Sequence, residues 1–294
     1  MPPAYAVAPA PEPPERINLL VLGVDQAESF VGNTDVIMIV SIDAESETIF
    51  VLSLPRDLCL GACDGHGSRI NEVYKRQGIE ALKQALRYVT GLNIDHWMLV
   101  NFHGVEAIIN QLGGVRVWSN REFDERFIYL DTEEEVRLIL EEGWNTLNGR
   151  EAVAYGRSRK YDSGGDFARI CRQQQVVRAL REQSLSPSLI VNAPALLASL
   201  SGAFRTDFPV DSVPALGNLL LAIPQGHINS WAVHARGHDL LIPEQGLDGA
   251  NLLRPDLHAI RDFVQDSLIE STQVHLDDQG NATFVSDNCE DYFP

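Results

Sequence analysis

A dense group of cationic side chains lies within the stretch YGRSRKYDSGGDFARICRQQQ, residues 155–175. From Arg157 to Arg178 the chain carries five arginines and one lysine against two aspartates, a local charge of +4. The whole chain has a formal net charge of -18, so the remainder carries -22. Arginine keeps its charge, and its planar guanidinium gives two parallel hydrogen bonds to a phosphate. We therefore expect this segment to bind an anion.

Two aspartates and another arginine stand at the ends of predicted strands. The apolar run INLLVLGV, residues 17–24, is typical of a central strand buried on both faces, and Asp25 follows it. The β-branched runs 36–42 and 48–54 predict an antiparallel hairpin, which places Asp35 beside Arg56. If the first strand pairs in parallel with the third, Asp25 reaches the same edge. Two carboxylates and one guanidinium would then share a rim.

Helical and strand-like patterns alternate along the rest of the chain. Strands are expected at 95–102, at 115–118 and near 229–243, whereas the acidic residues 119–146 suggest a solvated surface excursion. The expected helices cover 71–90, 103–114, 149–159, a stretch beginning near Asp166, two segments within 186–222, and 255–268. This alternation predicts an α/β fold in which a mixed central sheet is flanked by helices.

Two of these helices carry the cationic segment. Asn148 with Glu151 three residues later is typical of a capping box, so the first helix ends near Arg157. Asp166 can cap the second helix, and at 100° per residue it falls on the same face as Arg169 and Gln173. The two helices should therefore present one polar stripe.

The bulk composition limits the class of protein. With 294 residues, 45% of them hydrophobic, the chain can form one large domain or two small ones. A pI near 4.7 argues against a nucleic-acid-binding protein or a basic membrane-surface protein. No apolar run approaches the roughly 18–20 residues of a membrane span, and no signal-peptide pattern is present. We expect a soluble chain made of a Pro-rich linker at 1–16, one domain at 17–270, and a tail or short hairpin at 271–294.

The four cysteines leave alternatives open. Cys59 and Cys63 could close a small disulfide or, together with His66, offer three ligands to a metal ion. Cys171 and Cys289 are interpreted as buried thiols.

Several separated motifs occur in one order along residues 17 to about 182, with weaker similarity to about residue 268. They are LLVLGVD, NTDVIMIVSID, LSLPRD, RINEVY, VNFHGVEAIINQLGGV, LNGREAVAYGRSRK and DFARICRQQQVV. In this order they resemble the LytR-CpsA-Psr family.

The resemblance implies an extracytoplasmic enzyme of the bacterial cell envelope. Members of the family look like phosphotransferases that move a glycopolymer from a polyprenyl-pyrophosphate carrier onto peptidoglycan, and Mg²⁺ usually accompanies the pyrophosphate. The implied fold adds an apolar pocket for the lipid tail to the mixed sheet. It also implies a membrane anchor upstream of the linker, which this chain does not contain.

The motifs also imply roles for particular residues. Asp25 and Asp35 would coordinate Mg²⁺, either of them could act as the base, and Asp166 would orient Arg169 or Arg157. Tyr74, Asn101 and Phe102 match the family near the pocket and are interpreted as structural. The residues that would hold the pyrophosphate are Arg56, Arg157, Arg159, Arg169 and Gln173.

Two departures from the family pattern bear on activity. Asn33 and Ala27 stand where the family usually has arginine, and Arg69 or Arg76 could supply the missing charge. These departures keep two other functions open: a non-catalytic polyprenyl-phosphate binding protein, and a pyrophosphatase that acts on the same carrier. On composition alone, the arginines could also be solvated helical cations that pair with the acidic excess.

Overall fold

The computed structural model describes residues 16–26, 29–65, 68–129, 133–158, 166–184, 202–224, 227–234, 240–270, 285–286 and 289. The chain divides into two compact units. Unit one comprises 1–22, 32–97 and 224–285, and unit two comprises 23–31, 98–223 and 286–294. The expectations for Ala27, His66, Arg159, most of the linker and the first helix within 186–222 lie outside the described residues.

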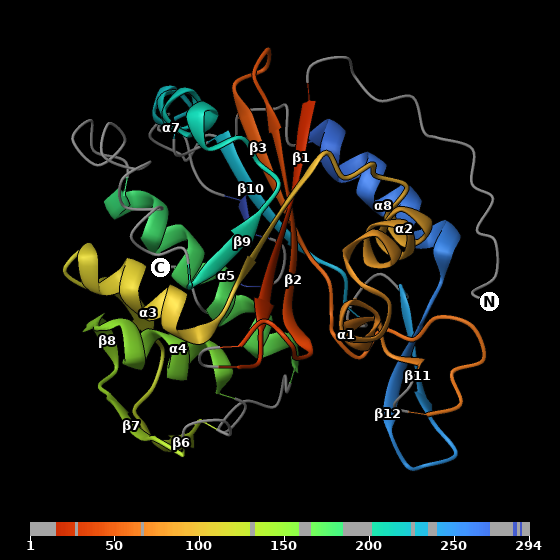
Figure 1. The fold of residues 1–294 in the computed structure, drawn as a ribbon, viewed down its shortest axis with the longest axis horizontal. Coiled ribbons are helices and arrows are strands. Elements are labelled where there is room, and N and C mark those ends of the chain that lie inside the picture. The colour runs from red at the N-terminus through yellow and green to blue at the C-terminus, as the bar shows by residue number, and fades with distance from the viewer. Residues whose placement is uncertain are drawn as a thin grey trace. The chain divides into compact units, whose positions relative to one another are not determined.

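Most helices and strands, which are labelled in Figure 1, lie entirely within one or the other of the two units. Unit one contains β1 (Arg16–Val24) up to Leu22, β2 (Thr34–Asp43), β3 (Thr48–Ser53), η2 (Ile70–Glu72), α1 (Val73–Gln77), α2 (Ile79–Thr90), β10 (Ile228–Ala232), β11 (Leu241–Gln245), β12 (Asn251–Pro255) and α8 (Leu257–Glu270). Unit two contains α3 (Phe102–Gln111), β5 (Val115–Ser119), β6 (Phe123–Ile128), β7 (Glu135–Leu140), β8 (Gly143–Leu147), α4 (Gly149–Arg157), α5 (Asp166–Ser184), β9 (Phe204–Thr206), η3 (Val210–Ser212) and α7 (Val213–Ala222). The division between the units falls within β1, within β4 (His96–Val100) and within β13 (Val285–Ser286).

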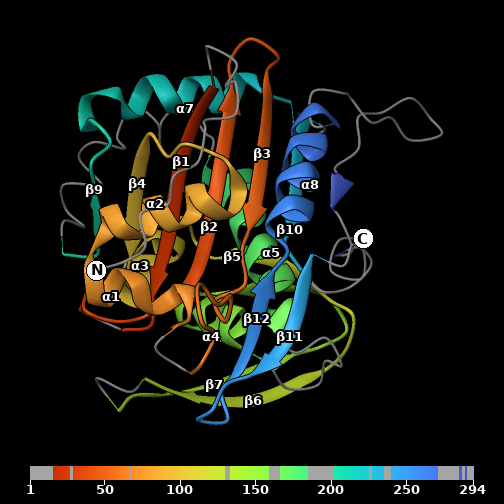
Figure 2. The same cartoon turned by 90° about the vertical axis from the view of Figure 1, so that its right-hand side faces the viewer.

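The largest sheet is mixed, as the sequence predicted. Its strand order is β13-β10-β3-β2-β1-β4-β9. Strands β2 and β3 form the predicted antiparallel hairpin, and β10 pairs in parallel with β3 (Figure 2). Strand β2 lies between β1 and β3, so the first strand does not pair with the third, the condition under which Asp25 was placed at the edge of Asp35 and Arg56.

Burial in unit one separates two kinds of strand. Every residue of β3 is buried, and so is every residue of β10. In β1 burial alternates, with Leu20 and Leu22 fully buried and their neighbours partly exposed. The apolar run at 17–24 therefore forms a strand with one face more buried than the other, and the expectation that it is buried on both faces is wrong. Strand β3 is the one buried on both faces.

Glycines set the helix boundaries of unit one. The expected single helix over 71–90 is interrupted at Gly78, whose φ of 83° is a conformation that favours glycine. Gly91, with φ of 79°, ends α2 as predicted, and its N–H bonds to the carbonyl oxygen of Arg87. Helix α2 packs against α8 (Figure 1).

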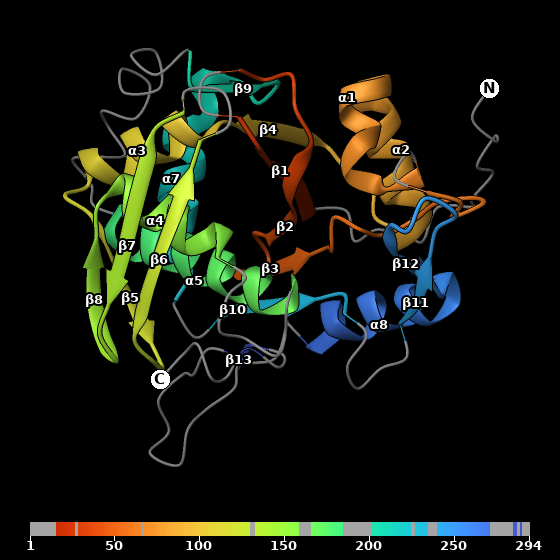
Figure 3. The ribbon, with the colours of Figure 1, turned by 90° about the horizontal axis from the view of Figure 1, so that it is seen from below.

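The acidic stretch 119–146 is not the surface excursion that the sequence suggested. It forms the antiparallel pair β6–β7 and strand β8, and β8 pairs with β5 (Figure 3). Burial alternates strictly along β6 and β7, which places Phe123, Phe127, Val136 and Leu138 in the core. The acidic residues occupy mainly the exposed alternate positions, so the composition of the segment concealed its period of two.

Both pairs of cysteines are disulfide-bonded. Cys59 is joined to Cys63, and Cys171 on α5 is joined to Cys289. The interpretation of Cys171 and Cys289 as buried thiols is therefore wrong, because spacing along the chain does not reveal which distant cysteine folds against α5. Among the described helices, none combines the length and the apolar character needed to cross a membrane.

A largely buried ion pair joins β1 to the end of β2. Arg16 Nη2 lies 2.9 Å from Asp43 Oδ2, with side chains only 5% and 12% exposed. The backbone N–H groups of Glu45 and Ser46 donate to Asp43 Oδ1 at 3.0 and 3.1 Å. Burial acts to raise the pKa of Asp43, but the hydrogen bonds from Ser46 and Glu45 and the charge of Arg16 outweigh it and lower that pKa.

We predict that Asp43→Ala lowers the free energy of unfolding by about 3 kcal/mol, because it leaves the Arg16 charge buried without its partner. A lowered folded-state pKa contributes stability above the unfolded value near 4, and that stability is lost as the pH falls through the folded value. Denaturant unfolding from pH 7 to pH 2 should therefore show the two proteins converging in acid. Glu45→Gln, at an exposed position in the same turn, is the control. A gap that stays constant to pH 2 would contradict the prediction.

We also predict that Cys289→Ser destabilises the chain by about 2–5 kcal/mol, because the lost bridge closes a sequence separation of 118 residues. Cys63→Ser opens a bridge with a separation of only 4 residues and should cost less. Thermal unfolding of both variants, with and without reductant, measures the difference. Equal losses would show that loop closure does not determine the contribution of these bridges.

Candidate functional site

Asp35 and Arg56 meet in unit one, as the hairpin predicted. Asp35 stands at the start of β2 and Arg56 shortly after the end of β3, and Leu54 N–H donates to the carbonyl oxygen of Ile37 across the hairpin at 2.9 Å. Arg56 Nη1 lies 2.8 Å from both Asp35 carboxylate oxygens. The side chains are 18% and 25% exposed, so the pair is accessible from only part of its surroundings.

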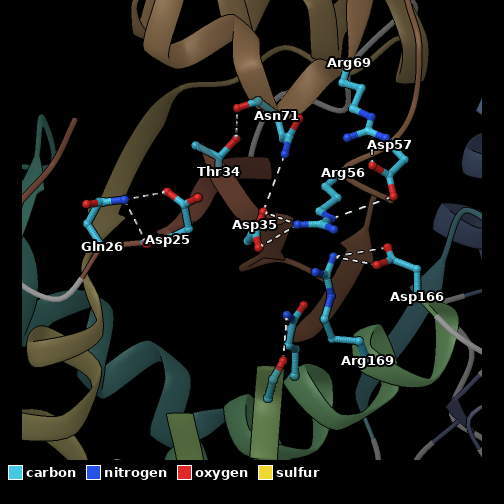
Figure 4. A network of polar contacts seen from close by, with 12 residues as sticks. Asp25, Gln26, Thr34, Asp35, Arg56, Asp57, Arg69, Asn71, Asp166 and Arg169 are labelled. Carbon is cyan, nitrogen blue, oxygen red and sulfur yellow. Dashed lines mark hydrogen bonds and ion pairs between the residues drawn. The ribbon is translucent and has the colours of Figure 1, made fainter. Parts of the chain in front are cut away.

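The ion pair continues into a short alternating chain of charges (Figure 4). Asp57 Oδ2 lies 3.8 Å from Arg56 Nε, and Asp57 Oδ1 lies 3.1 Å from Arg69 Nε. Arg69 also donates to the carbonyl oxygen of Asn251 at 3.1 Å. The structure thus brings Arg69 into the network of Arg56, with Asp57 as a link that the sequence analysis missed. Arg76 instead pairs with Glu72 on a side chain that is 56% exposed.

Asn71 is a second neighbour of Asp35 that sequence reasoning did not identify. Its side chain is buried, with Nδ2 3.5 Å from Asp35 Oδ1, and its backbone oxygen accepts from Thr34 Oγ1 at 3.3 Å. Within the described part of the chain, Asn71 Oδ1 is buried without a hydrogen-bond partner. A buried amide oxygen usually accepts a hydrogen bond, so Asn71 Oδ1 is a candidate ligand atom for a bound cation. Its motif, RINEVY, was the only signal available.

Asp25 belongs to unit two and lies beside Gln26. Gln26 Nε2 donates to the Asp25 backbone oxygen at 3.0 Å and to its Oδ1 at 3.3 Å. The carbonyl oxygen of Gln26 accepts from the N–H of Phe102 at the start of α3, at 2.9 Å. That Asp25 joins Asp35 and Arg56 at one rim stays a prediction, because the two groups belong to different units.

Arg169 and Asp166 meet on the first turn of α5. Arg169 Nη2 lies 3.0 and 3.1 Å from the two carboxylate oxygens of Asp166, and Arg169 is only 3% exposed. Asp166 thus contacts Arg169, and its expected role of orienting Arg169 or Arg157 toward pyrophosphate stays a prediction. Gln173, one turn later, donates to the carbonyl oxygen of Gly156 in α4 at 3.1 Å. Its role toward pyrophosphate stays a prediction.

Arg157 ends α4, whose start carries the predicted capping box. Asn148 Oδ1 accepts from Glu151 N–H at 3.1 Å, and Glu151 Oε2 accepts from Asn148 N–H at 2.9 Å. Arg157 Nη2 donates to the carbonyl oxygen of Ile128 at 3.3 Å, and its guanidinium lies 4.8 Å from the centre of the Phe102 ring. The side chain is thus held by a carbonyl and an aromatic face.

Arg172 is a further buried arginine, and its environment was not predicted from the sequence. It is fully buried on α5 and donates to the carbonyl oxygen of Ser158, the residue after Arg157. Ser158 Oγ donates to the buried Glu125 at 2.6 Å. These contacts fix the end of α4 from two sides.

Burial separates the arginines of this segment into two kinds. Arg178 forms an i,i+4 ion pair with Glu182 at 2.9 Å, and the two side chains are 27% and 41% exposed, as expected of a solvated helical cation. Arg169 and Arg172 are almost completely buried, which excludes that interpretation for them.

The comparisons with known proteins agree with the resemblance in the motifs. The chain is 28% identical over 259 residues to the polyisoprenyl-teichoic acid–peptidoglycan teichoic acid transferase TagV of Bacillus subtilis. It is 32% identical over 201 residues to TagU, of the same description, from Halalkalibacterium halodurans. These matches cover 85% and 68% of this chain but 64% and 63% of the relatives. The chain therefore spans less than two thirds of the length of either relative.

The fold is shared with solved structures of related proteins. The crystal structure of B. subtilis TagV superposes with a TM-score of 0.69 at 26% identity, covering 89% of this chain and 98% of that one. A protein from Streptococcus agalactiae superposes with a TM-score of 0.70 at 23% identity, over 87% and 88% of the two chains. The profile of the LytR-CpsA-Psr family matches residues 6–262, and the chain belongs to that family.

Proposed function

We propose that this protein is a phosphotransferase that moves a glycopolymer from a polyprenyl-pyrophosphate carrier to peptidoglycan. Membership of the LytR-CpsA-Psr family supports the proposal, as do the relatives TagV and TagU, which are named as transferases of teichoic acid to peptidoglycan. The reaction places the protein in the cell envelope, outside the cytoplasm, and the full-length protein would be tethered to the membrane upstream of this chain.

The observation that carries the proposal is that the motif arginines are held inside the fold. Arg56 is 18% exposed beside Asp35, and Arg169 is 3% exposed beside Asp166. A long flexible side chain loses much rotamer freedom when it is fixed in this way. The binding of an anionic ligand to such arginines therefore costs less side-chain conformational entropy, which favours a site for pyrophosphate.

The chemistry of the transfer suits this set of side chains. An acceptor hydroxyl attacks the phosphorus that carries the glycopolymer and forms a new P–O bond, while the bond to the bridging oxygen breaks. Polyprenyl phosphate leaves with the negative charge, and a phosphodiester remains. Guanidinium groups stabilise charge that grows on the leaving oxygens. Asp25 or Asp35 would accept the hydroxyl proton.

The carboxylates also fit a hard cation. Mg²⁺ prefers oxygen ligands, and Asp35 in unit one and Asp25 in unit two each offer a carboxylate. The amide of Asn71 contacts Asp35 through its Nδ2, and among the described residues its buried Oδ1 has no hydrogen-bond partner. When bound, Mg²⁺ would neutralise part of the charge on the pyrophosphate oxygens. Asp35 is paired with Arg56 in this structure, so its carboxylate is already held at the start of β2.

We predict that Arg56→Lys lowers kcat/KM for glycopolymer transfer about 10- to 100-fold, because lysine loses the planar fork that binds phosphate. The assay combines a polyprenyl-pyrophosphate-linked saccharide, Mg²⁺ and peptidoglycan fragments. Arg76→Lys, at the exposed pair with Glu72, is the matched control and should leave the rate unchanged.

Unchanged transfer by Arg56→Lys would remove Arg56 from the site. Two other results would contradict the transferase itself. Release of phosphate with no saccharide transferred would indicate a pyrophosphatase. Polyprenyl phosphate retained in native mass spectrometry without turnover would indicate a carrier-binding protein.

For the cation, we predict that Asp35→Asn weakens Mg²⁺ binding about tenfold or more, because it removes a charged oxygen ligand. Calorimetric titration with Mg²⁺ alone measures the affinity without any turnover. Glu72→Gln removes a nearby carboxylate that pairs with Arg76 and serves as the control. If both variants bind Mg²⁺ like the unchanged protein, Asp35 is not a ligand.

A further inference from the structure

Three aromatic rings of unit two surround the guanidinium of Arg157. Its Cζ atom lies 4.8 Å from the centre of the Phe102 ring, 5.3 Å from that of Tyr129 and 5.9 Å from that of Phe127. All three distances are within the range of cation–π attraction. We name these rings, Phe102, Phe127 and Tyr129, the aromatic seat.

The aromatic seat is itself rigid. Phe102 stacks on Tyr129 with ring centres 5.5 Å apart and planes inclined by 26°. Tyr129 is 1% exposed and Phe127 8% exposed, so both rings are fixed by the core. The phenol of Tyr129 donates to the carboxylate of Glu106, which is 7% exposed and lies 3.8 Å from Arg150 Nε. Burial and this carboxylate raise the pKa of Tyr129, so the phenol keeps its proton at neutral pH.

The two kinds of contact use different parts of a guanidinium. Aromatic rings attract its faces, whereas hydrogen bonds to phosphate oxygens lie in its plane. A ring that packs against a guanidinium face therefore fixes the orientation of the plane without competing for the N–H donors. The hydrogen bond from Nη2 to the carbonyl oxygen of Ile128 fixes one edge of the same plane.

We infer that Phe102, Phe127 and Tyr129 are positioning residues that hold Arg157 in the orientation in which it binds the pyrophosphate. This inference rests on the proposed function, because that function supplies the ligand. The alternative is that the rings belong only to the core and that Arg157 merely covers their edges. In that case the loss of a ring would change stability but not the affinity for pyrophosphate.

The orientation of Arg157 can be tested without a ligand. In the NMR spectrum of arginine-labelled protein, protons over a ring face shift upfield, and Arg157→Lys assigns the signal. Phe102→Leu should reduce this shift measurably, whereas Tyr129→Phe keeps the ring and should retain it. Phe263→Leu is the control, because this half-buried ring packs on Trp231 in unit one. An Arg157 signal that is unaffected by Phe102→Leu would contradict the packing of Phe102 against the Arg157 guanidinium.

Calorimetry with farnesyl pyrophosphate tests the consequence for binding. Phe102→Leu should raise the Kd about 3- to 30-fold, as expected from the loss of a cation–π contact. Phe263→Leu should change the Kd less than about twofold. If Phe102→Leu does not fold, Phe127→Leu replaces it, with an increase at the lower end of the range.

The outcomes separate this inference from the proposed function. If the unchanged protein does not bind farnesyl pyrophosphate, the proposed function fails, and the positioning role fails with it even where NMR supports the seat. If the unchanged protein binds and the folded Phe102→Leu binds equally well, only the positioning role fails.

Discussion

A guanidinium group that leaves water must find partners inside the protein, because an unmatched buried charge costs several kcal/mol. This chain is strongly acidic overall, yet it takes a series of arginines out of solvent. Arg16 and Arg169 are 5% and 3% exposed, and Arg172 is fully buried. Each must be matched locally, so the positions of these arginines determine where carboxylates, carbonyl groups and aromatic rings have to lie.

The two units meet this constraint in different ways. In unit one the partners are carboxylates at strand ends, so that Asp35, Arg56, Asp57 and Arg69 alternate in charge. In unit two Asp166 pairs with Arg169, whereas Arg172 uses a backbone carbonyl and Arg157 a carbonyl with three rings. Unit two therefore uses carbonyl groups and aromatic rings, as well as a carboxylate, to hold its arginines.

The sequence predicted what depends on local pattern. The hairpin of β2 and β3, the capping box at Asn148 and the pairing of Asp166 with Arg169 follow from turn residues, helix spacing and strand ends. What it did not predict depends on contacts between distant segments. The disulfide of Cys171 with Cys289 needs knowledge of the fold, and so does the burial of Arg172 against Ser158. The β6–β7 pair was missed for another reason, because its net acidity masked the alternation of buried residues.

The pairing of Asp35 with Arg56 has a consequence for the proposed reaction. A pyrophosphate that approaches Arg56 competes with a carboxylate for the same guanidinium, and a divalent cation that approaches Asp35 competes with a guanidinium for the same carboxylate. If the cation and the pyrophosphate arrive together, Arg56 exchanges Asp35 for the pyrophosphate and Asp35 exchanges Arg56 for the cation. Each side chain then keeps a partner of opposite charge. If only the anion arrives, the carboxylate loses its partner and opposes binding. The resting ion pair thus favours joint binding of cation and pyrophosphate over binding of either one alone, through coupling between the two ligands rather than through any movement of the chain.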